Sequence, residues 1–162
     1  MLKYLLPVIT VFLATVAFGQ HTFKKNDIYF EVLGNGIGAS INYERQLTSK
    51  PGLGLRAGIG YFSGDQEFRV SIPLGVIYLF SLSHHKSFLD AGIGGTWSGA
   101  AGLEKDISTG ERDYSERIWS IVPSIGYRRH TKNNFMWRTS FTPIINKYRV
   151  MPWLGISVGK RL

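Results

Sequence analysis

Two absences from this chain of 162 residues each exclude a class of protein. The sequence has no cysteine, which excludes a disulfide framework and a lipid anchor on a cysteine thiol. After Gly19 no apolar run approaches the roughly 20 residues that a membrane-spanning helix requires. Any membrane crossing would therefore use strands in a closed barrel, because an open sheet edge leaves backbone groups without hydrogen bonds in hydrocarbon.

The first residues have the composition of an export signal. A short positive start that contains Lys3 is followed by an apolar run over 4–16, and small residues at Ala17 and Gly19 suit a cleavage site. The apolar run is about 13 residues long, too short for a transmembrane anchor. We expect a signal peptide over 1–19, with residues 20–162 forming a single domain.

The net charge indicates which classes of binding partner to expect. The net charge is +8, and removal of Lys3 with the signal peptide would leave +7. Such a balance often indicates nucleic acid as a partner. An exported chain does not meet nucleic acid, so we expect outer-membrane lipid and lipopolysaccharide as partners instead. A basic surface without a specific partner is the alternative.

Alternation of apolar and polar residues is the main pattern in the rest of the chain. Apolar residues recur at every second position, which is the period of a β-strand. Turn residues separate the alternating stretches, for example Gly34-Asn35-Gly36 and Pro51-Gly52. Eight segments result: 27–33, 39–44, 53–62, 67–80, 89–97, 119–128, 135–143 and 153–162. We predict an all-β fold, an eight-stranded antiparallel up-and-down transmembrane β-barrel.

The two faces of these segments differ in a way that predicts which one faces outward. One face is bulky and apolar, with residues such as Ile59, Val76 and Ile125. The other mixes glycine, serine and threonine with charges, which suits the interior of a narrow barrel that must hold long arginine side chains. We therefore expect the apolar face to meet lipid. A secreted, soluble lipocalin-like barrel, with the apolar face inside, is the alternative.

Aromatic residues and loop lengths predict an orientation. Two girdles are expected at the two membrane interfaces. The periplasmic girdle would contain Tyr43, Tyr78, Phe80, Tyr127, Phe135 and Trp137, and the outer girdle Tyr61, Phe68, Trp97, Trp119 and Phe141. The longest connection, 98–116, would be extracellular, which places both termini in the periplasm.

Several short motifs carry a family resemblance over essentially all of the mature chain. They are residues 31–36, 41–45 and 123–128, Arg138 with 141–143, and the closing 154–161. In this order and spacing the chain resembles the small outer-membrane β-barrel proteins of Bacteroidetes-type bacteria, which are eight-stranded barrels like OmpA and OmpX. The resemblance implies a barrel in the outer membrane and no particular biochemical activity.

Charged residues on the inward face form the most informative set. They are Glu31, Glu44, Arg56, Asp90, Arg128, Arg138 and Arg161. Because an unpaired charge in a poorly hydrated lumen is costly, we expect an internal ion-pair network that joins Glu31 and Glu44 to Arg56. We interpret this network as a structural plug, since eight strands leave room for side chains and not for a water-filled channel. A proton or ion path is the alternative.

No pattern in the sequence indicates catalysis, a cofactor or a metal. The four histidines (His21, His84, His85 and His130) fall in the N-terminal leader or near periplasmic turns, away from serines on the strands. We therefore expect a structural or surface-interaction barrel that is not an enzyme. A lipid A-modifying enzyme and a narrow transport barrel are the alternatives.

The long connection is the candidate contact loop for an extracellular ligand or an envelope protein, because loops on a rigid scaffold often carry recognition. Its candidate residues are Glu104, Lys105, Asp106, Glu111, Arg112, Asp113 and Tyr114. A solvated loop of mixed charge is the alternative. The sequence leaves the oligomeric state open, and a monomer is our expectation.

Overall fold

The computed structural model describes residues 23–64, 67–83, 86–100, 117–131 and 133–162. The expected signal peptide and the seven candidate contact residues of the long loop lie outside these ranges. The elements are β1 (Asn26–Leu33), the 3₁₀ turn η1 (Gly34–Gly36), β2 (Ala39–Gln46), β3 (Leu53–Gly64), β4 (Glu67–Ser83), β5 (Ser87–Ala100), β6 (Ile118–His130), β7 (Phe135–Phe141), β8 (Ile144–Ile145), β9 (Val150–Met151) and β10 (Leu154–Arg161). Among the described residues no helix is long and apolar enough to cross a membrane.

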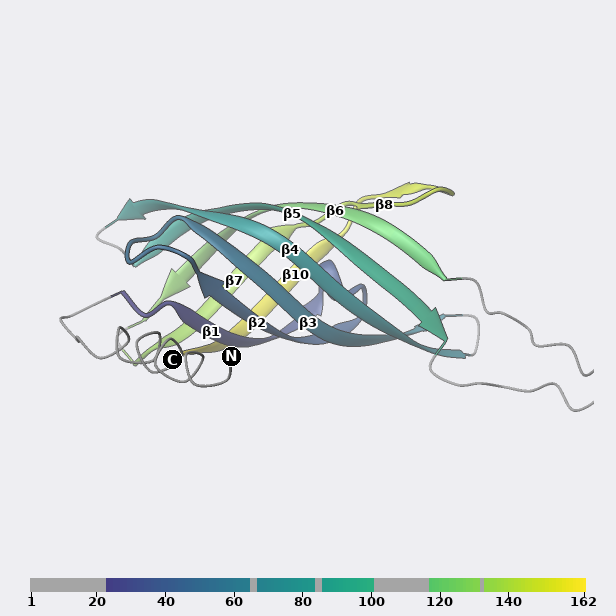
Figure 1. The fold of residues 1–162 in the computed structure, drawn as a ribbon, viewed down its shortest axis with the longest axis horizontal. Helices are drawn as coiled ribbons and strands as arrows, with labels where there is room; N and C mark the ends of the chain where they lie inside the picture. Colours follow the sequence, from purple (N-terminus) through teal and green to yellow (C-terminus); the bar gives the residue numbers. More distant parts are fainter. Residues whose placement is uncertain (1–22, 65–66, 84–85, 101–116, 132) are drawn as a thin grey trace, which may run out of the picture.

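Eight of the strands close into an antiparallel barrel (Figure 1). Each of β1 to β6 pairs with the next strand along the chain. The ring closes through β10, which pairs with β7 on one side and with β1 on the other. The predicted all-β, eight-stranded, up-and-down barrel is therefore confirmed.

The two ends of the barrel carry different connections. We call the end where β1 begins and β10 finishes the terminus end; the strand ends Gln46, Leu53, Ser83, Ser87, His130 and Phe135 also lie there. The opposite, far end carries η1, the β8–β9 hairpin and the strand ends Gly64, Glu67, Ala100 and Ile118. The barrel wall is uneven in height, because β4 has 17 residues and β7 has seven.

The short β8–β9 hairpin was not predicted from the sequence. Proline lacks a backbone N–H, and Pro143 and Pro152 interrupt the two strands at facing positions. The ladder survives beside them, because the N–H of Thr142 donates to the carbonyl of Trp153 at 2.8 Å. Beyond the prolines, Ile145 pairs with Ile121 of β6, so the hairpin extends the wall at the far end.

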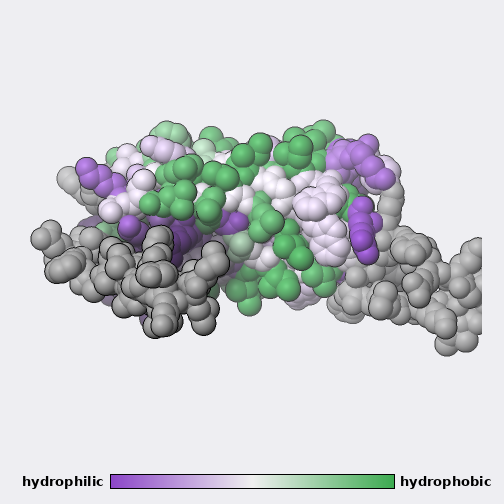
Figure 2. Space-filling view, in the orientation of Figure 1, coloured by the Kyte–Doolittle hydropathy of each residue, from purple (hydrophilic) through white to green (hydrophobic). Residues whose placement is uncertain are grey.

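The outward face of the barrel is apolar. Among the described residues 31 large hydrophobic side chains are exposed and only seven are buried, the reverse of a soluble core. Ile59 is 62% exposed, whereas Arg56 on the same strand is 2% exposed. Figure 2 shows the hydrophobic surface as a band around the middle, between hydrophilic patches at the two ends. The predicted orientation of the two faces is confirmed.

One of the predicted girdle positions is wrong. Phe141 is the last residue of β7, and the sequence analysis placed it in the girdle at the far end. In the structure it lies opposite Ile125, near the middle of β6, while Trp119 lies close to the far end of that strand. The β8–β9 hairpin, not Phe141, reaches the far end on this side of the wall.

Closure of the barrel predicts a specific cross-link. Phe30 of β1 lies directly opposite Val158 of β10, and facing Cβ atoms in antiparallel strands are about 4.5–5.5 Å apart, close to the separation that a disulfide spans. Because the chain has no cysteine, the double variant Phe30→Cys/Val158→Cys should form a single intramolecular disulfide on oxidation. Thiol titration and non-reducing gels would measure it. The matched pair Phe30→Cys/Trp137→Cys, two strands apart, should stay reduced. Equal cross-linking of both pairs would contradict the pairing of β1 with β10.

A closed, charged lumen as the candidate functional site

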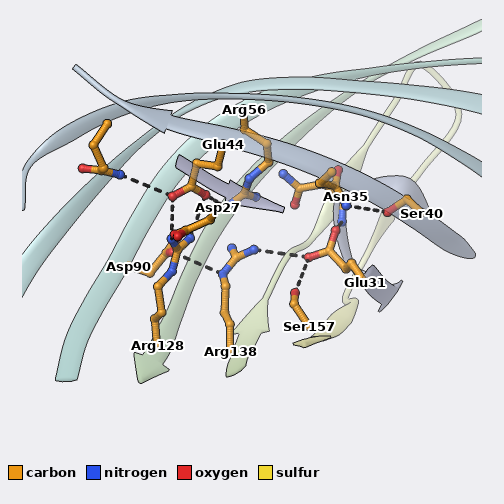
Figure 3. A network of polar contacts seen from close by, with 12 residues as sticks. Asp27, Glu31, Asn35, Ser40, Glu44, Arg56, Asp90, Arg128, Arg138 and Ser157 are labelled. Carbon is orange, nitrogen blue, oxygen red and sulfur yellow. Dashed lines mark hydrogen bonds and ion pairs between the residues drawn. The ribbon is translucent and has the colours of Figure 1, made fainter. Parts of the chain in front are cut away.

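Ion pairs join eight charged side chains inside the lumen. Four are carboxylates and four are arginines, so their formal charges cancel. The carboxylates are Asp27, Glu31, Glu44 and Asp90, and the arginines are Arg56, Arg128, Arg138 and Arg161. None of these side chains exposes more than 11% of its surface. Figure 3 shows seven of them meeting in the interior from different strands.

Arg128 lies at the centre of this network. It extends from β6 across the lumen and binds Glu44 of β2 through two parallel hydrogen bonds, of 2.5 and 2.7 Å. The same guanidinium contacts Asp27 of β1 at 3.2 Å and Asp90 of β5 at 2.5 Å. A planar guanidinium that binds three carboxylates fixes their positions relative to one another, so Arg128 ties opposite walls of the barrel together.

The other buried arginines complete a pattern of alternating charge. Arg138 contacts Glu31 at 3.2 Å and Asp90 at 3.3 Å. It faces Arg128 directly across the β6–β7 ladder, and the Asp90 carboxylate contacts both guanidinium groups. Like charges on facing positions repel, so an intervening opposite charge is required. Arg56 contacts Glu44 at 3.4 Å and Asp90 at 3.9 Å.

The network differs in its pairing from the one expected from the sequence. Glu44 meets Arg56, its facing neighbour, but the Glu31 carboxylate binds Arg138 of β7. Asp27 was not among the candidates, although its position on the inward face of β1, opposite both Glu44 and Arg161, was a usable signal. Arg161 contacts Asp27 at 3.8 Å, at the edge of the network.

The turn between β1 and β2 folds into the lumen on the far side of the ion pairs. The sequence indicated a turn here, and in the structure Gly34, Asn35 and Gly36 are all buried. The Glu31 carboxylate accepts a hydrogen bond from the backbone N–H of Asn35 at 3.1 Å. Thr96 donates to the carbonyl of Asn35, and Ser71 donates to that of Gly36, both at 2.7 Å. Strands β4 and β5 thus hold the turn inside.

Glycine is required at the start of this turn. Gly34 has a φ of 65°, a backbone conformation that other residues rarely adopt. A Cβ atom there would lie 2.4 Å from the Glu31 side chain, so no larger residue fits without displacing that carboxylate. The turn and the ion-pair network therefore share one residue, Glu31, and neither can move independently of the other.

An apolar cluster covers the network at the terminus end. Ile77, Leu79 and Phe88 are buried together, with Phe23 packed against them. The ring of His130 lies 4.7 Å from that of Phe88. His130 is 2% exposed, and its Nε2 lies 3.9 Å from a carboxylate oxygen of Asp27. The position of His130 near a turn in the sequence did not predict this burial.

Three layers therefore lie in the lumen: the inward turn, the ion pairs and the apolar cluster. The formal charges of the ion-pair layer balance, and each of its four guanidinium groups contacts at least one carboxylate. Within the described residues no group of three His, Cys, Asp or Glu side chains could hold a metal ion. The arrangement is suited to cross-bracing a barrel from inside.

Comparison with known proteins supports the fold and gives no further identification. No protein-family model matches the sequence, and no curated protein matches it. Among solved structures, the chain matches the crystal structure of the N-terminal β-barrel domain of Pseudomonas aeruginosa OprF, with a TM-score of 0.60 and 11% sequence identity. The match covers 85% of this chain and 96% of that domain. At this identity the likeness shows a shared barrel fold.

The central position of Arg128 predicts a large stability loss when its charge is removed. Arg128→Gln leaves the carboxylates of Glu44, Asp27 and Asp90 without their common partner, and breaking a buried ion pair from one side costs about 3–5 kcal/mol. The same change at the edge of the network, Arg161→Gln, removes one ion pair at 3.8 Å, a hydrogen bond to the carbonyl of Lys24 and a contact with the Phe23 ring, and should cost less, about 1–2 kcal/mol. Equilibrium denaturation of the two refolded variants measures this; similar losses would contradict a network centred on Arg128.

Proposed function

We propose that this protein is an integral outer-membrane β-barrel with a structural or surface-interaction role. The observation that carries the proposal is the outward apolar wall around an inward charged network. In water, 31 exposed hydrophobic side chains would favour aggregation. In a bilayer the same wall is solvated by acyl chains, and closure of the ring of strands removes the open sheet edge whose backbone groups hydrocarbon could not satisfy.

Aromatic side chains near the terminus end support this location. Tyr78 and Phe80 pack at 4.5 Å between ring centroids, and Tyr127 packs against Trp137 at 5.4 Å. The Tyr127 hydroxyl donates to Ser87, so the ring lies on the outer wall with its polar tip toward the end of the barrel. Rings with one apolar and one polar side are typical of the interface between acyl chains and water.

The filled lumen favours a structural role over transport. A water-filled path would have to pass the buried guanidinium groups of Arg128 and Arg138. Each of them contacts at least two carboxylates, and Asp90 contacts both. It would also have to pass the inward turn, which hydrogen bonds hold in place. Opening such a path would break several buried ion pairs at once, which costs far more than thermal motion supplies.

In the proposed orientation the terminus end faces the periplasm and the far end the cell exterior. The long β5–β6 connection would then be extracellular and available to a ligand or an envelope protein through the residues named above, Glu104 to Tyr114. Short connections at the terminus end fit this orientation, since membrane barrels have short periplasmic turns and longer outer loops.

Membrane insertion predicts that the cost of a charge on the outer wall depends on its depth. Ile59→Arg, near the middle of β3, places a guanidinium at the level of the acyl chains and should destabilise the barrel by about 2–4 kcal/mol in lipid vesicles. Leu82→Arg, beside the terminus end of β4, should cost about 0–1 kcal/mol. Urea unfolding in vesicles measures both values. Equal, small effects together with solubility in the absence of detergent would contradict a membrane location.

A second test concerns the long loop. Replacing residues 101–116 with a short glycine–serine linker should leave the barrel closed, because these residues lie outside the strand ladder. If the loop carries recognition, the replacement should abolish binding of intact cells to the ligand or envelope protein that the parent strain binds. Barrel closure would be followed by the shift in gel migration on heating. Unchanged binding would show that the loop carries no recognition and support the alternative, a solvated loop of mixed charge.

A further inference from the structure

An apolar groove runs over the outer wall from β2 to β6. It has a volume of about 750 Å³ and is open to the exterior. Its outward-facing residues fall in two neighbouring cross-strand rows, each defined by the strand register. The first row is Tyr43, Ala57, Leu74, Gly95 and Ile121, and the second is Arg45, Leu55, Val76 and Ile93.

Two small residues create this groove. Ala57 and Gly95 flank Leu74 in the first row, where neighbouring positions of the wall carry isoleucine, leucine or tyrosine. A Cβ atom on Gly95 would find its nearest neighbour, the carbonyl oxygen of Ser120, at 4.0 Å. The position therefore has space for a larger side chain, and the groove results from the choice of small residues in this row.

The groove is inclined to the barrel ends because the strands are tilted. At its β2 end lies Arg45, the residue before the last of that strand, next to the terminus end. At its β6 end lies Ile121, the fourth residue from the start of that strand at the far end. A long apolar molecule in the groove would therefore have one end beside Arg45 and its length within the apolar band.

The outer surface at the terminus end is strongly basic. Lysines and arginines are exposed on or beside the strand ends there: Lys24, Arg45, Lys50, Lys86, Arg129 and Lys160. The carboxylates of the strands near this end, Asp27, Glu31, Glu44 and Asp90, are all buried in the lumen. Among the described residues no aspartate or glutamate faces outward at this end, so this basic rim is not neutralised by the protein itself.

We propose that the groove binds one acyl chain of an anionic phospholipid, whose phosphate is bound by Arg45 and the basic rim. This inference rests on the proposed membrane location. Guanidinium groups bind phosphate oxygens through paired hydrogen bonds, and basic residues attract anionic headgroups at a membrane surface. The combination of an apolar channel with one cationic end matches a phospholipid in both shape and charge.

The test is native mass spectrometry of the full chain, purified from membranes in detergent and titrated with phosphatidylglycerol or with zwitterionic phosphatidylcholine. The parent protein should retain one phosphatidylglycerol in preference to phosphatidylcholine. Arg45→Gln should weaken retention of phosphatidylglycerol roughly fivefold, the effect of losing one basic contact at a lipid surface, and should weaken phosphatidylcholine less, because its choline cation already offsets the phosphate charge.

Filling the groove tests the acyl chain separately. Gly95→Leu and Ala57→Leu place side chains in the groove from β5 and β3 and should each lower retention of both lipids about tenfold or more. Ala91→Leu is the matched control, on the outer face of β5 but outside the groove, and should bind as the parent does. The shift in gel migration on heating verifies that each variant forms a closed barrel.

Two results would overturn the inference. One is unchanged lipid retention in Gly95→Leu and Ala57→Leu in barrels that insert normally. The other is a dimer in the parent protein that disappears in both variants, which would assign the groove to a second copy of the chain. Failure of the proposed function gives a different result, since Ile59→Arg would then have no effect in vesicles.

Discussion

The structure depends on charges that cannot reach water and must therefore satisfy one another. Arg128 extends from β6 to carboxylates on β1, β2 and β5, so a single side chain connects its own strand to β1 and β2, with which β6 does not pair. Desolvating these groups is expensive, and only close pairing offsets the cost. A chain that fails to bring the strands into this register would leave several charges buried and unpaired, which penalises incorrectly closed barrels. The network thus contributes as much to selecting one register as to its stability.

Alternation along each strand was enough to predict eight strands, their antiparallel order and which face points outward, because these properties follow from local period and short turns. The partner of Glu31 and the membership of Asp27 were not predicted. Whether two inward side chains meet across the lumen depends on strand tilt and on the stagger of the closed ring, and neither is encoded in any single strand.

The missed hairpin and the inward turn have a different cause. Residues 34–36 have the composition of an exposed turn, and the hydrogen bonds that hold the turn inside come from Glu31 and from the lumen-facing hydroxyls of Ser71 and Thr96. Likewise, Pro143 and Pro152 were each compatible with the end of a strand. They interrupt one ladder together because they lie near each other in space, which requires the pairing of β7 with β10 to be known.

The burial of carboxylates in the lumen also determines the charge of the outer surface at the terminus end. Four carboxylates are needed inside to neutralise four arginines, which removes the acidic side chains of β1, β2 and β5 from the outer surface near the terminus end. The remaining bases there face outward, so this rim is basic as a consequence of how the lumen is balanced. A surface that is basic at one edge and apolar above it is complementary to one leaflet of a bilayer, and the basic rim and the groove meet at Arg45. The same distribution of charge thus has two effects. It pairs the charges inside the barrel, and it leaves outside the bases to which we attribute the proposed preference for anionic lipid.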